Sequence, residues 1–123
     1  MYRVNNIYWK ELDDTQKLLE VAKRVFGWQE FIMPDGWRAF LPPGADPASD
    51  SFLILKELPP YLTDYHYMAE AVKETHKEMH ADQHPVDGSW VVWYNGWTGY
   101  APSFCEAAAI AMLREVGNNV ITD

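Results

Sequence analysis

Apolar side chains recur at intervals of three and four residues in the stretch that follows Asp13 and Asp14. These apolar positions are Leu18, Leu19, Ala22, Val25 and Phe26. Such spacing forms one apolar stripe along an amphipathic helix. Either aspartate can cap the free amides at the helix start. Gly27 follows the stripe directly, at the position where helices commonly end. The pattern therefore predicts a first helix from about residue 13 to residue 26.

Two short runs of apolar and aromatic residues follow, over residues 28–33 and 37–41, with Pro34-Asp35-Gly36 between them. Each of these three residues suits a tight turn, so the segment predicts a β-hairpin. Residues 42–51 have the composition of a surface loop, and we expect this loop to be mobile. The apolar run over residues 52–55 fits either a short strand or an apolar latch.

A second helix is predicted to open at Thr63-Asp64, because Pro59-Pro60 excludes a helix just before it. On a helical wheel one face is mostly apolar and consists of Tyr65, Met68, Ala69, Val72, His76 and Met79. The opposite, charged face consists of Glu70, Lys73, Glu74, Lys77 and Glu78. We expect this helix to stop before Pro85, since a residue that precedes proline resists helical angles.

The run from Ser89 to Tyr94 is apolar on both of its alternating faces. Trp90, Val92 and Tyr94 point one way, while Val91 and Trp93 point the other way. This pattern predicts a central strand with both faces covered. Asn95-Gly96 is a strong signal for a two-residue hairpin turn, which returns the chain over residues 97–101.

The last predicted helix opens at Ser103, with Glu106 at the spacing of a capping box, and ends at Gly117. The whole order is helix, hairpin, loop, helix, hairpin, helix. It predicts an α+β fold, a three-layer α/β/α sandwich with a mostly antiparallel sheet built from two hairpins. We expect one domain over residues 1–123, with an ordered core at about 12–117.

Composition narrows the function classes. The chain has 123 residues and a formal net charge of -8, with 18 acidic and 10 basic residues. This charge disfavours direct binding to nucleic acid and suits either a basic partner or plain solubility. No apolar run approaches the ~20 residues needed to span a membrane. The N-terminus lacks the apolar segment of a signal peptide, so we expect a cytoplasmic protein.

Three histidines form the strongest candidate for a metal site. His76 and His80, four residues apart on the predicted helix, could share a zinc ion, with Asp82 or Asp87 as a further ligand. The simpler interpretation is that His76 packs within the apolar stripe and that His84 lies beyond the helix. We therefore predict no metal and no cofactor.

Catalytic motifs are weak. Cys105, the only cysteine, falls in the first turn of the last helix, where the helix dipole can lower the pKa of a thiol. No residue pattern orients a base toward it, so a packing role is the simpler interpretation. Glycine-rich phosphate loops are absent from the sequence. We therefore predict that the protein is not an enzyme.

The excess of aromatic residues is the more informative signal. Trp28 and either Trp90 or Trp93 are assigned to the core. Trp37 and Trp97 each follow a turn glycine, where burial is harder, so they are either partner anchors or caps of the sheet edge. Together with Arg38 and Tyr100, these two tryptophans could also line a pocket for a small molecule.

Four segments resemble one family, the phage ABA sandwich domain proteins. The matching segments are Val21–Trp28, Pro42-Pro43, Pro59–Asp64 and Cys105–Leu113. The resemblance covers about residues 12–117 and implies a sheet between two helical layers, with no activity attached. The second helix and the loop over residues 46–50 depart from the family pattern.

This resemblance leads to a functional hypothesis. We expect a phage-encoded accessory protein, located in the cytoplasm of the bacterial host, that binds and inhibits a host protein or ribonucleoprotein, for example a CRISPR effector. The expected contacts are Trp37, Arg38, Trp97, Tyr100, Glu70, Glu74 and Glu78. The alternatives are a sponge for nucleotide signals and a structural or assembly protein of the virion.

Overall fold

The computed structural model describes residues 5–123. Its three α-helices are α1 (Asp14–Arg24), α2 (Tyr65–Glu74) and α3 (Phe104–Glu115), within this range. Two 3-10 turns, η1 (Trp9–Glu11) and η2 (Leu55–Glu57), lie between the larger elements. No helix in the described range is both long enough and apolar enough to cross a membrane.

The strands of this range form three small sheets. β1 (Asn6–Tyr8) pairs in parallel with β7 (Asn119–Ile121), and β2 (Gln29–Ile32) is antiparallel to β3 (Arg38–Leu41). The third sheet is antiparallel, with β5 (Trp90–Tyr94) between β4 (Met79–Gln83) and β6 (Trp97–Ala101). The predicted mixed α+β class is confirmed.

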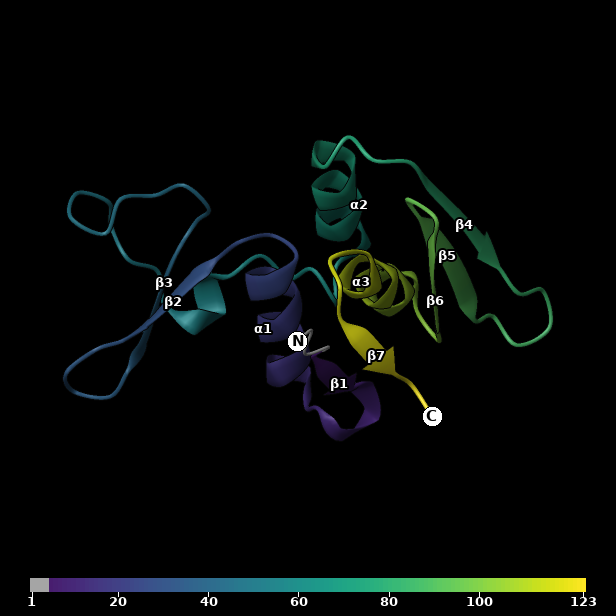
Figure 1. Ribbon diagram of the computed structural model, residues 1–123, viewed down its shortest axis with the longest axis horizontal. Coiled ribbons are helices and arrows are strands. Elements are labelled where there is room, and N and C mark those ends of the chain that lie inside the picture. The colour runs from purple at the N-terminus through teal and green to yellow at the C-terminus, as the bar shows by residue number, and fades with distance from the viewer. Residues whose placement is uncertain (1–4) are drawn as a thin grey trace, which may run out of the picture.

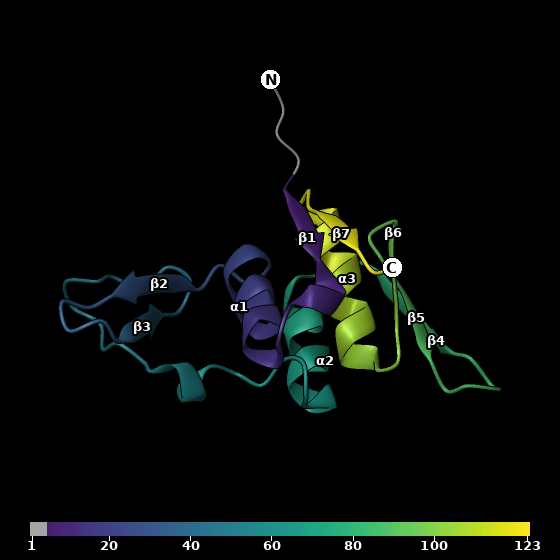
Figure 2. The ribbon, with the colours of Figure 1, turned by 90° about the horizontal axis from the view of Figure 1, so that it is seen from below.

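Helix α3 occupies the centre of the molecule (Figure 1). The β4–β5–β6 sheet lies on one side of α3, and α1 and α2 lie on the other (Figures 1 and 2). The β2–β3 hairpin projects beyond α1, at the end of the molecule opposite the three-stranded sheet. The arrangement separates a densely packed centre from an outlying hairpin.

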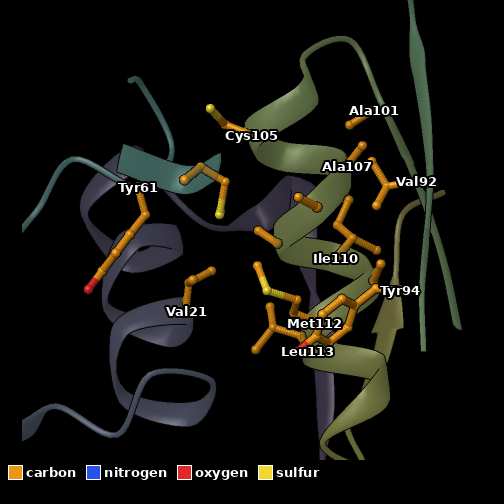
Figure 3. Packing of buried hydrophobic residues seen from close by; sticks show 14 of the residues in the cluster. Val21, Tyr61, Val92, Tyr94, Ala101, Cys105, Ala107, Ile110, Met112 and Leu113 are labelled. Carbon is orange, nitrogen blue, oxygen red and sulfur yellow. The ribbon is translucent and has the colours of Figure 1, made fainter. Parts of the chain in front are cut away.

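Small side chains allow α3 to pack very closely against the sheet. Its alanines, Ala107, Ala108, Ala109 and Ala111, are completely buried, and Figure 3 shows the helix between α1 and the strands. Gly99 of β6 lies so near that a Cβ atom built there would be 2.0 Å from the carbonyl oxygen of Ala107. A side chain at position 99 would therefore collide with the helix backbone.

Several predicted elements are confirmed. Helix α1 starts after Asp13, whose side chain accepts a hydrogen bond from the Gln16 amide at 2.8 Å. The first hairpin is present as β2 and β3. In the second hairpin, Asn95 and Gly96 both have positive φ angles, 47° and 86°, as a type I′ turn requires.

The predicted extent of the second helix is wrong. Helix α2 ends at Glu74, the Thr75 hydroxyl donates a hydrogen bond to the carbonyl of Val72 at 2.7 Å, and His76 adopts a left-handed φ of 58°. The chain then continues as strand β4, which pairs with β5. The helical wheel extended too far because the hydrogen bonds offered by β5 are not visible in a local pattern.

The parallel β1–β7 pair was not predicted. Ile7 and Val120 on these strands are buried against the core, although both lie outside the residue range 12–117 expected to hold it. The Arg114 guanidinium donates to the carbonyl of Val120 at 2.7 Å and to that of Thr98 at 2.9 Å. One α3 side chain thus ties β7 to the edge of the three-stranded sheet.

The structure also shows which conformation residues 52–55 adopt, for which the sequence allowed a short strand or an apolar latch. Within residues 52–55, Leu53 forms an isolated bridge with Phe40 before the chain enters η2. In the loop over residues 42–51, the Asp46 carboxylate accepts hydrogen bonds from the Ala48 amide at 2.9 Å and from the Ser49 hydroxyl at 3.1 Å. The mobility of this loop stays a prediction.

Strand β5 is central, as predicted, but its two faces differ. Val92 and Tyr94 are buried against α3, whereas Trp93 on the other face is 39% exposed and Val91 is half-buried. No described element lies over this outer face in either ribbon view (Figures 1 and 2). The expectation that the monomer covers both faces of this strand is therefore wrong.

Candidate functional site

The outer side of the three-stranded sheet is the first candidate site. Strand alternation and register place six side chains there, which we call the open sheet face. Its members are His80, Asp82, Val91, Trp93, Thr98 and Tyr100. Tyr100 is 57% exposed, so two large aromatic side chains of neighbouring strands face solvent.

Neighbouring polar groups hold these two aromatic side chains in place. The imidazole of His80 packs on Trp93 with ring centroids 5.3 Å apart, and its Nε2 lies 3.5 Å from an Asp82 carboxylate oxygen. The Tyr100 hydroxyl is 2.7 Å from Ser89 Oγ. These contacts restrict both aromatic side chains.

A polar cluster lies at one end of this face. The Asp87 carboxylate accepts hydrogen bonds from the Ser89 hydroxyl at 2.6 Å and from its amide at 2.9 Å, and His84 Nδ1 lies 3.3 Å away. The hydrogen bonds from Ser89 hold the pKa of Asp87 below its usual value, and the nearby imidazole acts in the same direction. Ser89 Oγ contacts Asp87 and Tyr100 but no histidine of the described chain, so these contacts do not form a serine nucleophile.

The second candidate site is a groove of about 980 Å³ between α1 and the chain that runs from β3 through η2. We call it the hairpin groove. Most of its lining is apolar, and Trp37 at the hairpin contributes a side chain that is 42% exposed. Its lining residues are Asp14, Thr15, Lys17, Leu18, Trp37, Arg38, Ile54, Leu55, Lys56, Leu58, Pro60, Leu62, Thr63 and Glu106.

The predicted aromatic pocket is not assembled. Trp37 and Arg38 both line the hairpin groove, but Trp97 and Tyr100 belong to β6, at the opposite end of the molecule (Figure 1). Trp97 and Tyr100 also point to opposite sides of that strand, because they are three residues apart. Of the four residues, only Tyr100 belongs to the open sheet face.

The three predicted acidic contacts are exposed. Glu70 and Glu74 lie one turn apart on α2, and Glu78 lies in the connection to β4. No salt bridge between described residues involves any of the three. Their charges are therefore available to attract a basic partner.

The candidate zinc ligands do not share a helix face. His76 is exposed beyond the end of α2, and not within an apolar stripe, whereas His80 lies on β4. Within residues 5–123, no group of three or more His, Cys, Asp or Glu side chains is arranged to hold a metal ion.

Cys105 is buried in the first turn of α3. Burial raises the pKa of its thiol, and the nearby carboxylate of Asp64 raises it further. The helix dipole, which was expected to lower this pKa, is outweighed by desolvation. The thiol is therefore protonated near neutral pH and packs as a small apolar group.

Glu106 has an unexpected role. Ser103 accepts a hydrogen bond from the Glu106 amide, as one half of the predicted capping box requires. The Glu106 carboxylate accepts instead from Trp9 Nε1 at 3.1 Å and from Lys17 Nζ at 3.0 Å. Glu106 thus joins the chain before α1, α1 itself and α3 beside the hairpin groove.

Comparisons with protein-family models, curated proteins and solved structures find no match for this chain. The resemblance to the phage ABA sandwich family rests on the sequence segments alone. The two candidate sites are therefore defined by the geometry and chemistry of their side chains.

The surface position of Trp93 and the hairpin groove were not predicted from the sequence. The two-residue alternation correctly placed Trp93 and Val92 on opposite faces of the strand. No local signal shows whether another element covers the face that carries Trp93. The groove joins residues from α1, the first hairpin and η2, and only the folded chain brings these together.

Proposed function

We propose that this domain is a binding protein that docks a bacterial host protein or ribonucleoprotein on its open sheet face and thereby inhibits it. The observation that carries this proposal is the pair of exposed aromatic side chains, Trp93 and Tyr100, on a sheet whose other face is sealed by α3. In this proposal the chain is a phage accessory protein that acts in the host cytoplasm.

The chemistry of the face favours a protein surface as the partner. Large aromatic side chains with a polar tip are typical anchors of protein interfaces, because they bury much apolar area and lose little conformational freedom. Around Val91 and Trp93 lie His80, Asp82 and Thr98, which resemble the polar rim of an interface. None of the six positions is a lysine or arginine, so the face offers no cation to a phosphate backbone.

The rest of the surface supports a basic partner. Glu70, Glu74 and Glu78 add to a net charge of -8, and such a field speeds the approach of a basic surface at low salt. A partner seated on the open sheet face would also cover the bare side of β5. Both faces of β5 would then be covered, as its apolar pattern predicts.

A capture experiment from bacterial host lysate tests this proposal. The full chain serves as bait beside a Trp93→Ser/Tyr100→Ser variant and a matched control, Tyr8→Ser/Ile32→Ser, in which two exposed apolar side chains from other surfaces are replaced. We expect the wild type and the control to retain the same partner. The face variant should lose at least about tenfold in affinity, because each interface anchor contributes about 1–2 kcal/mol or more.

A charge variant tests whether the three exposed glutamates attract the partner. Glu70→Lys/Glu74→Lys/Glu78→Lys should weaken capture at low ionic strength and have little effect at high salt, since screening removes long-range attraction. Equal capture by the face variant and the control, with all proteins folded by thermal melting, would refute the open sheet face as the docking site.

A further inference from the structure

The hairpin groove combines an apolar floor with cations at its rim. Five aliphatic side chains line it, and Trp37 is the sole aromatic residue among its lining. The five are Leu18, Ile54, Leu55, Leu58 and Leu62. Ile54 is 37% exposed, so the groove leaves apolar area in contact with water that a ligand could cover.

The local charge is opposite to that of the molecule. Three of the ten lysines and arginines in the chain, Lys17, Arg38 and Lys56, line this groove, against two acids, Asp14 and Glu106. The lining therefore has an excess of one positive charge, and it repels an anion less than the rest of a surface with net charge -8 does.

The three cations are not equally available. Lys17 is paired with Glu106 at 3.0 Å. Arg38 lies 3.6 Å from Glu30, but that carboxylate also pairs with Lys23 at 3.0 Å, so one negative charge is shared between two cations. Lys56 is exposed and has no ion pair among residues 5–123. Arg38 and Lys56 are therefore the groups that an incoming anion would meet.

We propose that the hairpin groove binds a small anionic amphiphile, a molecule with an aliphatic body and one carboxylate. The aliphatic body lies on the leucines and against Trp37, while Arg38 and Lys56 hold the carboxylate by charge-assisted hydrogen bonds. A volume of about 980 Å³ is at the upper end of the range for small-molecule sites. The aliphatic lining favours this ligand over a nucleotide, whose base would need more aromatic stacking surface than Trp37 supplies.

This site is independent of the proposed docking face. The groove is lined by residues of the first hairpin, α1, the chain before α2 and Glu106 of α3, whereas the open sheet face is made of β4, β5 and β6 and faces away from α3 (Figure 1). Loss of the amphiphile site would leave partner capture unchanged. Loss of the docking face would leave the binding of the amphiphile unchanged.

Calorimetric titration of the full chain tests the proposal with three probes: dodecanoate, dodecyltrimethylammonium and AMP. The first two share one alkyl chain and differ in the sign of the charge, and both are used below their critical micelle concentrations. We expect saturable binding of dodecanoate, with dodecyltrimethylammonium and AMP at least about tenfold weaker, the equivalent of one lost charge-assisted contact.

Matched charge variants identify the site. Lys56→Glu and Lys73→Glu change the net charge equally, and Lys73 is an exposed residue of α2 that does not line the groove. Dodecanoate affinity should fall about tenfold in Lys56→Glu and stay unchanged in Lys73→Glu. Equal affinities in the two variants, comparable binding of the cationic probe, tighter binding of AMP, or no binding of dodecanoate would each overturn the proposal.

Discussion

The two ends of the molecule are stabilised in different ways. At one end, the three-stranded sheet packs against the central helix α3, in which every residue from Phe104 to Leu113 except Glu106 is buried. The backbones of β6 and α3 nearly touch at Gly99. At the other end, the hairpin is anchored through a small cluster of Leu19, Phe40 and Leu58. The first end depends on small residues, and the second depends on a few large ones.

This difference affects what each end can offer a partner. A sheet fixed rigidly on α3 presents Trp93 and Tyr100 without needing to reorganise, which limits the entropic cost of docking. The hairpin is anchored through the smaller of the two core clusters, so we expect it to adjust more readily relative to α1, and the groove lies along this boundary. We therefore expect preorganised binding at the sheet and adaptable binding at the groove.

The largest expected effect is that of Gly99→Ala. The added Cβ would lie 2.0 Å from the carbonyl oxygen of Ala107 and 2.7 Å from the amide nitrogen of Ala111, and backbone atoms cannot yield as a flexible side chain can. We expect a loss of at least about 3 kcal/mol in the free energy of unfolding, measured by denaturant titration. The exposed neighbour Thr98→Ala should lose less than about 1 kcal/mol, and similar losses in both would contradict the close packing.

An intermediate and more local effect is expected for Phe40→Ala. Phe40 is completely buried between Leu19 and Leu58, and removal of such a side chain costs about 3 kcal/mol. In hydrogen exchange, the amides of β2 and β3 should lose protection while those of α3 keep theirs. Ile32→Ala, at a 65% exposed position of the same hairpin, is the control. Equal loss of protection in α3 would show that both ends unfold as one unit.

The smallest effect concerns pH and Cys105. Burial, mainly, raises the pKa of this thiol above its ordinary value of 9.0, so the unfolded chain releases the proton at a lower pH than the folded chain does. Stability should therefore fall as the pH rises above about 9.

Comparison of the wild type with Cys105→Ala at pH 8 and pH 10, by denaturant unfolding, isolates this contribution. Tyr61 also has a pKa raised by burial and acts in the same direction, but it is present in both proteins. The variant should show the shallower fall in stability. An identical fall in both proteins would mean that the thiol titrates equally in the folded and unfolded states.

Local sequence signals correctly predicted the elements that are specified by contacts between residues close together in the chain. The Asp13 cap, the Asn95-Gly96 turn and the alanine-rich run of α3 each act on neighbouring backbone, so the chain needs no distant partner to specify them. The same logic failed for the segment after Glu74, where helix-like spacing continued but the hydrogen bonds of β5 converted residues 79–83 into a strand. The β1–β7 pair joins strands at opposite ends of the sequence, which no local pattern can show.

The candidate sites show the same division. The sequence by itself determined that Trp93 and Val92 point to opposite faces of their strand, because side-chain direction in a strand is a property of the backbone. It also determined that Trp37 directly follows a turn glycine. Only the tertiary structure decided that Trp93 faces solvent while Val92 is sealed by α3, and that Trp37 shares a groove with Lys56. Burial depends on which distant segment packs against a face, and the free energy of that packing is a property of the whole chain.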